Sequence, residues 1–309
     1  MRKSRFHAMR IGLLTRNENA WCSTQLRRSF RRKNVDAICF GFADLAARIS
    51  HKPEVGFRGL DLRSELKAVL VRPIGRGSLE EILFRLDMLQ KLARSGLTVI
   101  NHPSSIERSA DKYNTLAIME EHNIRVPRTV VTENVRDALK AFKAFGEDVI
   151  VKPIFGSRGI GAARISNVDI AERAFRTLRF NRHVLYVQEY VEHGTSDIRA
   201  FVVGGRVVAA MRRVAKSWKT NVSLGARAVP VKLSEDLERI AVDAAKAIGC
   251  EIAGVDLVDE SPKPTVLEIN SQPGWRGLQT TTDRPISDHI ADYVISRAKR
   301  PHRPTMPSA

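Results

Sequence analysis

The sequence predicts an α/β plus α+β protein of 309 residues, with a parallel sheet first and antiparallel sheets after it. Over the first hundred or so residues, short apolar runs alternate with segments of helical period, which is typical of parallel strands joined by helices. In the rest of the chain, both hairpins and helices connect the strands, which indicates an α+β fold. At about 150 residues per domain, the length suggests two domains or three small modules.

The first part begins with a strand at Met9. Residues 1–8 are basic but precede no long apolar stretch, so we do not expect them to be a secretory signal. We expect a disordered extension or an over-called start there. The helix over Leu79–Arg94 is the clearest element, because its apolar residues recur every three or four positions. The other elements expected here are strands at Met9–Leu14, Val35–Phe40, Ala68–Val71 and Leu97–Ile100, and a helix at Ser23–Lys33.

The second part contains two predicted hairpins. Gly204-Gly205 is a tight turn between Ile198–Val203 and Arg206–Met211. Ala253–Val258 and Thr265–Asn270 form the other hairpin. The remaining expected elements are helices at Ser109–Asn123, Asn134–Phe145, Val168–Leu178, Leu233–Ile248 and Ile286–Ala298, and extended segments at Val126–Val131, Asp148–Pro153, Ala162–Ile165 and Leu185–Val191. Residues 300–309 are proline-rich without a periodic apolar face, and we expect them to be disordered.

The composition limits the classes of partner. The chain has 51 Lys and Arg against 34 Asp and Glu, a formal net charge of +17, which favours acidic partners. Basic residues of 27–33 would line one side of a helix, which is either a solvated face or an attractive surface for anions. Only 6% of residues are aromatic and no nucleic-acid-binding motif is present, so specific nucleic-acid binding is not expected.

Location follows from two further observations. No run of 18 apolar residues exists, so no membrane span is expected. Cys22, Cys39 and Cys250 lie too far apart for a CxxC pair, a disulfide framework or a zinc site. We expect buried thiols in a reducing cytosol, and therefore a cytoplasmic protein.

The first candidate site is a lysine followed by a glycine loop. Lys152 ends an apolar strand, and the loop after it contains Gly156, Gly159 and Gly161. Glycines let backbone N–H groups approach phosphate oxygens, and a lysine supplies a point charge. The alternative is an ordinary hairpin turn. The segment is neither a Walker loop nor a Rossmann fingerprint, because the spacing differs from both.

The second candidate site is acidic. Glu268 and Asn270 share one face of a strand, and a hairpin would place Asp256 beside them. Two carboxylates and an amide oxygen are hard ligands that suit magnesium. The alternative is a solvated face or an ion pair with the abundant arginines.

A third segment is informative only in combination with the other two. The strand that ends at Tyr190-Val191 leads into Asp197, so main-chain groups could meet a purine edge and a carboxylate could hold ribose hydroxyls. By itself, this signal is close to noise.

Together and in this order, the motifs resemble the ATP-grasp superfamily and, within it, the RimK-like glutamate ligases. The resemblance covers roughly residues 9–298. The matching pieces are Ser109-Ala-Asp111-Lys112, Val149-Ile-Val-Lys152-Pro153, Gly156-Ser-Arg-Gly159-Ile-Gly161, Gln188-Glu189-Tyr190-Val191, Ser196-Asp197-Ile-Arg199, Ala253-Gly-Val-Asp256 and Glu268-Ile-Asn270-Ser-Gln-Pro273-Gly274.

The resemblance implies the ATP-grasp fold. An N-terminal α/β domain would span 9–105, and two α+β subdomains, 106–190 and 191–299, would enclose ATP. Lys112 and Lys152 would hold phosphates, with the loop 156–161, including Ser157, closing over them as a lid.

Other residues take further roles in that pattern. Glu189, Tyr190 and Val191 would meet adenine, Asp197 the ribose, and Lys219 the nucleotide. Asp256, Glu268 and Asn270 would hold two Mg²⁺ (or Mn²⁺) ions, with Glu268 bridging them. Arg213 and Asn221 would lie near the γ-phosphate as catalytic groups.

The resemblance also implies the reaction, an ATP-dependent joining of L-glutamate to an acceptor carboxylate through an acyl phosphate, with ADP and phosphate as products. The identity of the acceptor is the part of the resemblance that can be carried over least well, because Val222-Ser-Leu224 and Trp275-Arg276 depart from the pattern of many relatives. Arg199, Trp275 and Arg276 are the candidate acceptor-binding residues, with Trp275 either a stacking platform or a packed aromatic.

We expect an anionic acceptor, the glutamyl tail of a pterin-type coenzyme. The alternative is an acidic protein tail, on a ribosomal protein or an amino-group carrier protein. A second alternative is a non-catalytic ATP-grasp protein that binds nucleic acid or the ribosome. A homo-oligomer is left open.

Overall fold

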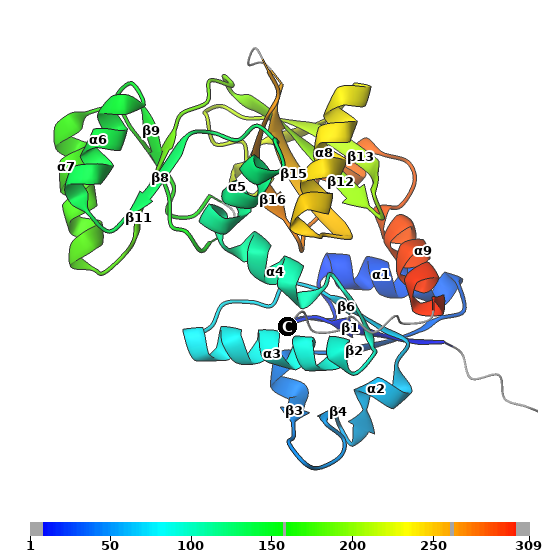
Figure 1. The fold of residues 1–309 in the computed structure, drawn as a ribbon. Helices are drawn as coiled ribbons and strands as arrows, with labels where there is room; N and C mark the ends of the chain where they lie inside the picture. The colour runs from blue at the N-terminus through cyan, green and yellow to red at the C-terminus, as the bar shows by residue number, and fades with distance from the viewer. Residues whose placement is uncertain (1–8, 157–158, 260–262, 301–309) are drawn as a thin grey trace, which may run out of the picture.

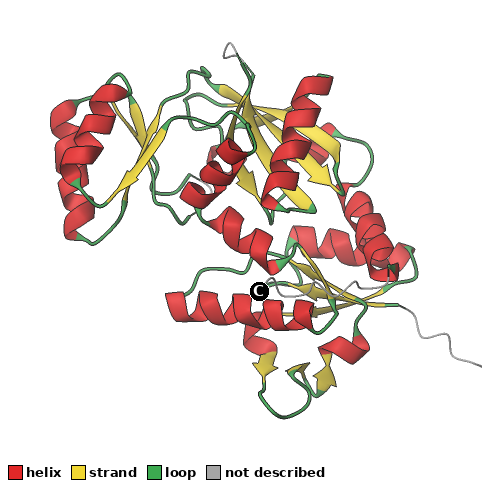
Figure 2. Cartoon of the chain, viewed as in Figure 1, coloured by secondary structure: helices red, strands yellow, loops and turns green. Residues whose placement is uncertain are grey.

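The computed structural model describes residues 9–156, 159–259 and 263–300, and these residues form four sheets (Figure 1, Figure 2). The first sheet has the order β2-β1-β6-β7 with every pair parallel, as the alternating pattern predicts. Its strands are β1 (Arg10–Leu14), β2 (Asp36–Phe40), β6 (Ala68–Val71) and β7 (Thr98–Ile100).

Both faces of this sheet are covered. Alternate strand residues such as Ile11 and Leu13 pack with Leu26 and Phe30 of helix α1 (Trp21–Arg32). The opposite face packs on α3 (Leu79–Arg94), which begins at a Ser78 capping box. The strands are therefore almost continuously apolar, as expected of a parallel sheet between two layers.

The C-terminal helix α9 (Ile286–Lys299) returns to this first part of the chain and packs beside α1 (Figure 1). The Ser29 hydroxyl donates to the Ser287 hydroxyl at 2.8 Å, and Arg32 pairs with Asp288 at 2.6 Å. The two ends of the chain thus share one core.

The second and third sheets are antiparallel. The second has the order β10-β9-β11-β8 and carries two helices on one face, which form a lobe of their own in Figure 1. Its elements are β8 (Thr129–Thr132), α6 (Val135–Ala144), β9 (Val149–Val151), β10 (Ala163–Ile165), α7 (Val168–Phe180) and β11 (Leu185–Glu189).

The third sheet has the order β14-β13-β12-β15-β16 and packs on α8 (Glu235–Ile248) and α5 (Lys112–Glu121). Its strands are β12 (Ser196–Val203), β13 (Arg206–Val214), β14 (Arg227–Pro230), β15 (Ile252–Val258) and β16 (Thr265–Asn270). Both predicted hairpins are confirmed, and Gly204 and Gly205 have φ of 58° and 76°, which the tight turn requires.

Three expectations need correction. The helix expected over Ser109–Asn123 is two helices, α4 (Pro103–Ala110) and α5, because Asp111 has extended backbone and its carboxylate caps α5. Residues 41–66, left unassigned, form a small sheet and a short helix. These are β3 (Leu45–Ala47), β4 (Val55–Phe57), β5 (Leu60–Asp61) and α2 (Leu62–Glu65). Strand β14 was not expected either.

Residues 1–8 and 301–309, for which disorder is expected, lie outside the described residues. Within the described part of the chain, no helix has the length and apolar character needed to cross a bilayer.

Candidate active site

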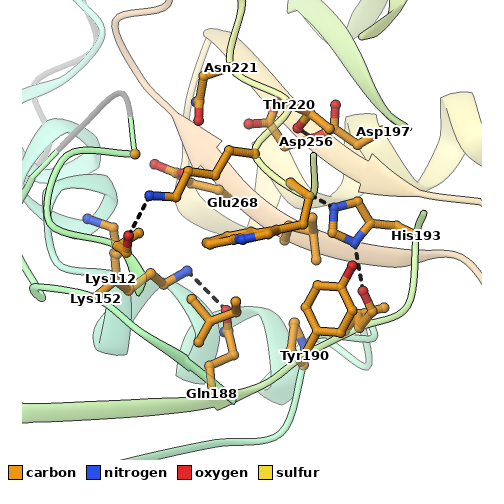
Figure 3. Close-up of a pocket in the computed structure, with 18 of the residues that line it drawn as sticks. Lys112, Lys152, Gln188, Tyr190, His193, Asp197, Thr220, Asn221, Asp256 and Glu268 are labelled. Carbon is orange, nitrogen blue, oxygen red and sulfur yellow. Dashed lines mark hydrogen bonds between the residues drawn. The ribbon is translucent and has the colours of Figure 1, made fainter. Parts of the chain in front are cut away.

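An open pocket lies where elements of the second and third sheets face each other (Figure 3). Most residues expected to bind nucleotide or to act on it line this pocket. They are Lys112, Lys152, Gly156, Gly159, Glu189, Tyr190, Val191, Asp197, Arg213, Lys219, Asn221, Asp256 and Glu268. Ser157 lies outside the described residues, and Gly161 and Asn270 are not among the lining residues.

Two lysines stand beside Glu268 at one end of the pocket (Figure 3). Lys152 follows β9, and its ammonium donates to Gln188 Oε1 at 3.0 Å from β11. Burial lowers the pKa of Lys152 to about 8, with repulsion from Lys112 adding to the effect and attraction to Glu268 opposing it. Burial likewise lowers the pKa of Lys112. Attraction to Glu268 does not offset the cost of burying these two ammonium groups. Phosphate oxygens, which are negatively charged, are therefore suitable ligands for them.

The glycine loop folds over these lysines. Lys112 donates to the carbonyls of Ile154 and Gly156 at 3.1 and 2.9 Å, and Lys219 donates to that of Ala162 at 2.7 Å. Gly159 has φ of 69°, and a Cβ placed there would lie 2.7 Å from Asn221 Oδ1. The loop therefore touches both sides of the pocket, and a glycine is needed where it meets Asn221.

The strand end at Glu189 to Val191 forms the opposite side of the pocket. The Glu189 carboxylate accepts from the backbone and side chain of Arg128, so main chain rather than carboxylate is left to face the pocket. His193 contacts two carbonyls, with Nδ1 2.7 Å from Val191 O and Nε2 3.0 Å from Trp218 O. It thereby ties the strand end to the segment that carries Lys219 and Asn221.

Buried side chains of alternating charge lie next to one another on strands β12, β13 and β15 of the third sheet. Arg213 is bidentate to Asp197, at 2.7 and 2.5 Å, and lies 3.1 Å from Asp256. Asp256 also receives two hydrogen bonds from Arg199. Burial opposes the charge of Asp256, but the two guanidinium groups hold its pKa below its ordinary value. Thr220 donates to Asp197 at 2.6 Å, so the expected ribose ligand already has partners on both oxygens, and its ribose role stays a prediction.

The acidic hairpin has the register that the sequence predicts, with Asp256 opposite Glu268 and Gly254 opposite Asn270. Within the described residues, no hydrogen bond or ion pair engages the Glu268 carboxylate, and no group of three or more His, Cys, Asp and Glu has metal-binding geometry. Glu268 and Asn270 are oxygen donors that fit magnesium, whereas Asp256 is already gripped by two arginines.

The expected acceptor residues are not brought together in the pocket. Trp275 is 1% exposed and packs edge-on against Trp21 and Phe201, so the stacking-platform interpretation is wrong in this structure and the packed-aromatic alternative holds. Arg199 is committed to Asp256, and Arg276 is exposed away from the pocket lining.

Sequence reasoning missed several lining residues. Gln188 belongs to the segment Gln188–Val191, but no role was expected for it. It lies two positions from Tyr186, so both side chains are on one face of the strand, and this spacing could have indicated a polar group directed at Lys152. His193, Trp218 and Thr220 come from irregular segments, where no periodicity marks the side that faces a pocket.

We expect nucleotide affinity to fall as pH rises through the pKa of Lys152. Below about pH 8 the ammonium is charged and attracts phosphate. Above it the charge is lost, so affinity for a non-hydrolysable ATP analogue should drop about tenfold between roughly pH 7.5 and 9.5.

Lys152→Arg is the matched comparison. Its guanidinium stays charged but fits the site differently, so binding should be weaker at neutral pH and flat with pH. The same pH dependence in both proteins, measured by calorimetric titration, would assign the titration to another group.

Comparison with known proteins now adds to this geometry. Residues 109–294 match a family described as the RimK-like ATP-grasp domain. The chain is 33% identical over 298 residues to the tetrahydromethanopterin:alpha-L-glutamate ligase of Methanococcus maripaludis, covering 94% of this chain and 99% of that protein. It is 31% identical to a probable alpha-L-glutamate ligase of Vibrio vulnificus, covering 94% and 97%. Its fold is similar to that of the ATP-grasp ligase PsnB bound to a minimal precursor, with a TM-score of 0.74, 18% identity, and 95% and 100% of the two chains covered.

Proposed function

The chain belongs to the RimK-like ATP-grasp family, and from that premise we propose that it adds L-glutamate to the glutamyl tail of a pterin-type coenzyme. The family makes it an ATP-dependent glutamate ligase. The observation that carries the assignment of the site is one pocket that combines two desolvated lysines, a glycine loop and a carboxylate, Glu268, which lies near the lysines but forms no ion pair or hydrogen bond with a described residue.

Forming an amide from a carboxylate requires activation, because its oxygen is a poor leaving group. The acceptor carboxylate attacks the γ-phosphorus of ATP, which gives an acyl phosphate and ADP. The amine of glutamate then attacks the acyl carbon, an amide bond forms, and phosphate leaves. We assign Lys112 and Lys152 to hold the phosphate oxygens and to offset the charge as the phosphoryl group moves.

The glycine loop and its contacts protect the intermediate. An acyl phosphate hydrolyses if water reaches it, so the described parts of the loop, 153–156 and 159–162, held by Lys112 and Lys219, would exclude water from the pocket. Asn221, which meets Gly159 across the pocket, would help hold the loop closed. Val191 and its neighbours would present main chain to adenine.

Magnesium fits the acidic hairpin. Glu268 and Asn270 would hold it, and Asp256 would be a third ligand if its ion pairs with arginine were broken. We propose that two ions bind. Bound Mg²⁺ supplies neutralisation of the phosphate charge. The use of ATP and the three free cysteines support action in the cytoplasm.

The coenzyme acceptor is supported by the relatives named tetrahydromethanopterin:alpha-L-glutamate ligase and by the net charge of +17. A protein tail remains the second candidate, because several solved structures of similar fold hold peptides. The experiment incubates the protein with ATP, Mg²⁺ and labelled glutamate, and with either tetrahydromethanopterin or a peptide that ends in glutamate.

We expect ADP formation together with a mass increase of one or more glutamyl residues on the pterin. Extension of the peptide alone would replace the pterin assignment. ATP turnover that ignores glutamate would contradict the proposed reaction.

A further inference from the structure

The first sheet changes its direction of growth at β1, since β2 pairs on one side of β1 and β6 on the other. In open α/β sheets, ligands bind outside the carboxyl ends of the strands at such a point. Arg72 follows β6 directly, and Arg16 is the second residue after β1. The exposed Arg16 lies against the loop after β6, because a Cβ placed on Gly75 would be 2.8 Å from Arg16 Cδ.

Arg72 is a buried cation without an anion. It is 6% exposed, and its Nη2 donates to the Pro273 carbonyl at 3.0 Å while its guanidinium lies 4.8 Å from the centre of the Trp275 ring. Burial lowers its pKa, and its interaction with Cys22 opposes this effect. No carboxylate of the described residues pairs with it. A buried charge is costly unless it is paired, so an anionic ligand would offset this cost.

Two neutral donors stand in the same place. Gln272 Nε2 and Trp275 Nε1 are buried and have no hydrogen-bond partner among the described residues. Gln272 is held there because its Oε1 accepts from the backbone N–H of Ile74 at 3.2 Å. All these unsatisfied groups are donors, and a carboxylate, which only accepts, is their complement.

A short segment of the chain connects this edge to the strand that carries the proposed magnesium ligands. The segment that holds Gln272, Pro273 and Trp275 continues from β16, which carries Glu268 and Asn270. A ligand on Arg72 therefore lies a few residues along the chain from the end of the pocket where the phosphates are expected.

We propose that this carboxyl edge binds a carboxylate of the acceptor, an inference that rests on the proposed function. The terminal residue of a glutamyl tail has two carboxylates, of which one joins the incoming amine. Arg16 at the surface would bind the other, and the buried donor atoms of Arg72, Gln272 and Trp275 would donate to it once the side chains that enclose them move apart. The grip would fix which carboxylate faces ATP, so these side chains are specificity residues.

The test uses tryptophan fluorescence without nucleotide. The chain has three tryptophans, and Trp218→Phe leaves Trp21 and Trp275, which contact each other at this edge. The probe is N-acetyl-L-glutamyl-L-glutamate, which has the carboxylates of a glutamyl tail and no free amine. We expect saturable binding that Arg16→Glu weakens about tenfold or more, because the charge is reversed where the anion docks.

Arg28→Glu is the matched control, since Arg28 is an exposed arginine of α1 away from the edge. Arg72→Lys should also weaken binding, because an ammonium cannot replace a planar fork. Equal affinity in Arg16→Glu, Arg28→Glu and the parent protein would overturn the inference, whether or not Arg72→Lys folds, as would a parent protein that does not bind the probe.

The outcome is separable from that of the proposed function. Glutamate-dependent ADP formation tests the ligase reaction and does not require this edge. In that assay Arg16→Glu should raise the KM of the acceptor about tenfold and leave the KM of ATP near its parent value. A KM change for ATP alone would contradict the assignment of this edge to the acceptor.

Discussion

Glu268→Ala is expected to abolish ligation while the protein stays folded. Glu268 lies beside two lysines at one end of the pocket and is the carboxylate best placed to hold magnesium at the phosphates. Losing that ligand should remove several kcal/mol of charge stabilisation in the transition state, which is on the order of a thousandfold or more in rate. Glutamate-dependent ADP release measures the effect.

Glu107→Ala is the matched control, because it removes an exposed carboxylate from α4 outside the pocket. It should leave the rate near that of the parent protein. Circular dichroism and a thermal melt establish that Glu268→Ala is folded. A folded Glu268→Ala protein that keeps more than about a tenth of the parent rate would remove Glu268 from the reaction.

Arg213→Ala should cost stability as well as activity. The Arg213 and Asp197 side chains are 5% and 3% exposed, and Arg213 also compensates Asp256. Removing the guanidinium leaves buried carboxylates short of positive charge, a loss of about 3–5 kcal/mol in the free energy of unfolding. Urea denaturation measures it through the midpoint and slope.

Arg239→Ala provides the comparison, since Arg239 pairs with Asp236 at the surface, where both side chains are more than half exposed. That variant should denature like the parent protein. Adding Asp197→Asn to Arg213→Ala should restore part of the lost stability, because one uncompensated charge is gone. Equal midpoints for Arg213→Ala and Arg239→Ala would show that the buried network does not stabilise the fold.

The sequence pattern was enough to predict an element wherever residues close together in the chain determine its conformation. The helix over Leu79–Arg94 has the predicted bounds, and the hairpin that sets Asp256 opposite Glu268 has the predicted register. Helical period and strand alternation depend on which face is buried, and tight turns depend on glycines with positive φ. These features depend on residues that are close together in the sequence.

The predictions from sequence pattern failed where two local preferences compete for the same residue. Asp111 lies inside a stretch of helical character, yet its side chain can cap a new helix, and the cap prevails. The small strands of residues 41–66 are two or three residues long, too short to display a period.

By itself, the sequence determined the order of most of the elements, the two hairpins, and most of the lysines, glycines and acidic residues that the fold brings to one pocket. Only the tertiary structure decided how those residues are paired. Asp256 is gripped by Arg199 and Arg213, and Trp275 lies in the core under Arg72 instead of facing an acceptor. The physical reason is that charge pairing and burial depend on neighbours far away in the chain. Arg72 and Pro273 are 201 residues apart in sequence and hydrogen-bonded in space, and no periodicity records that contact.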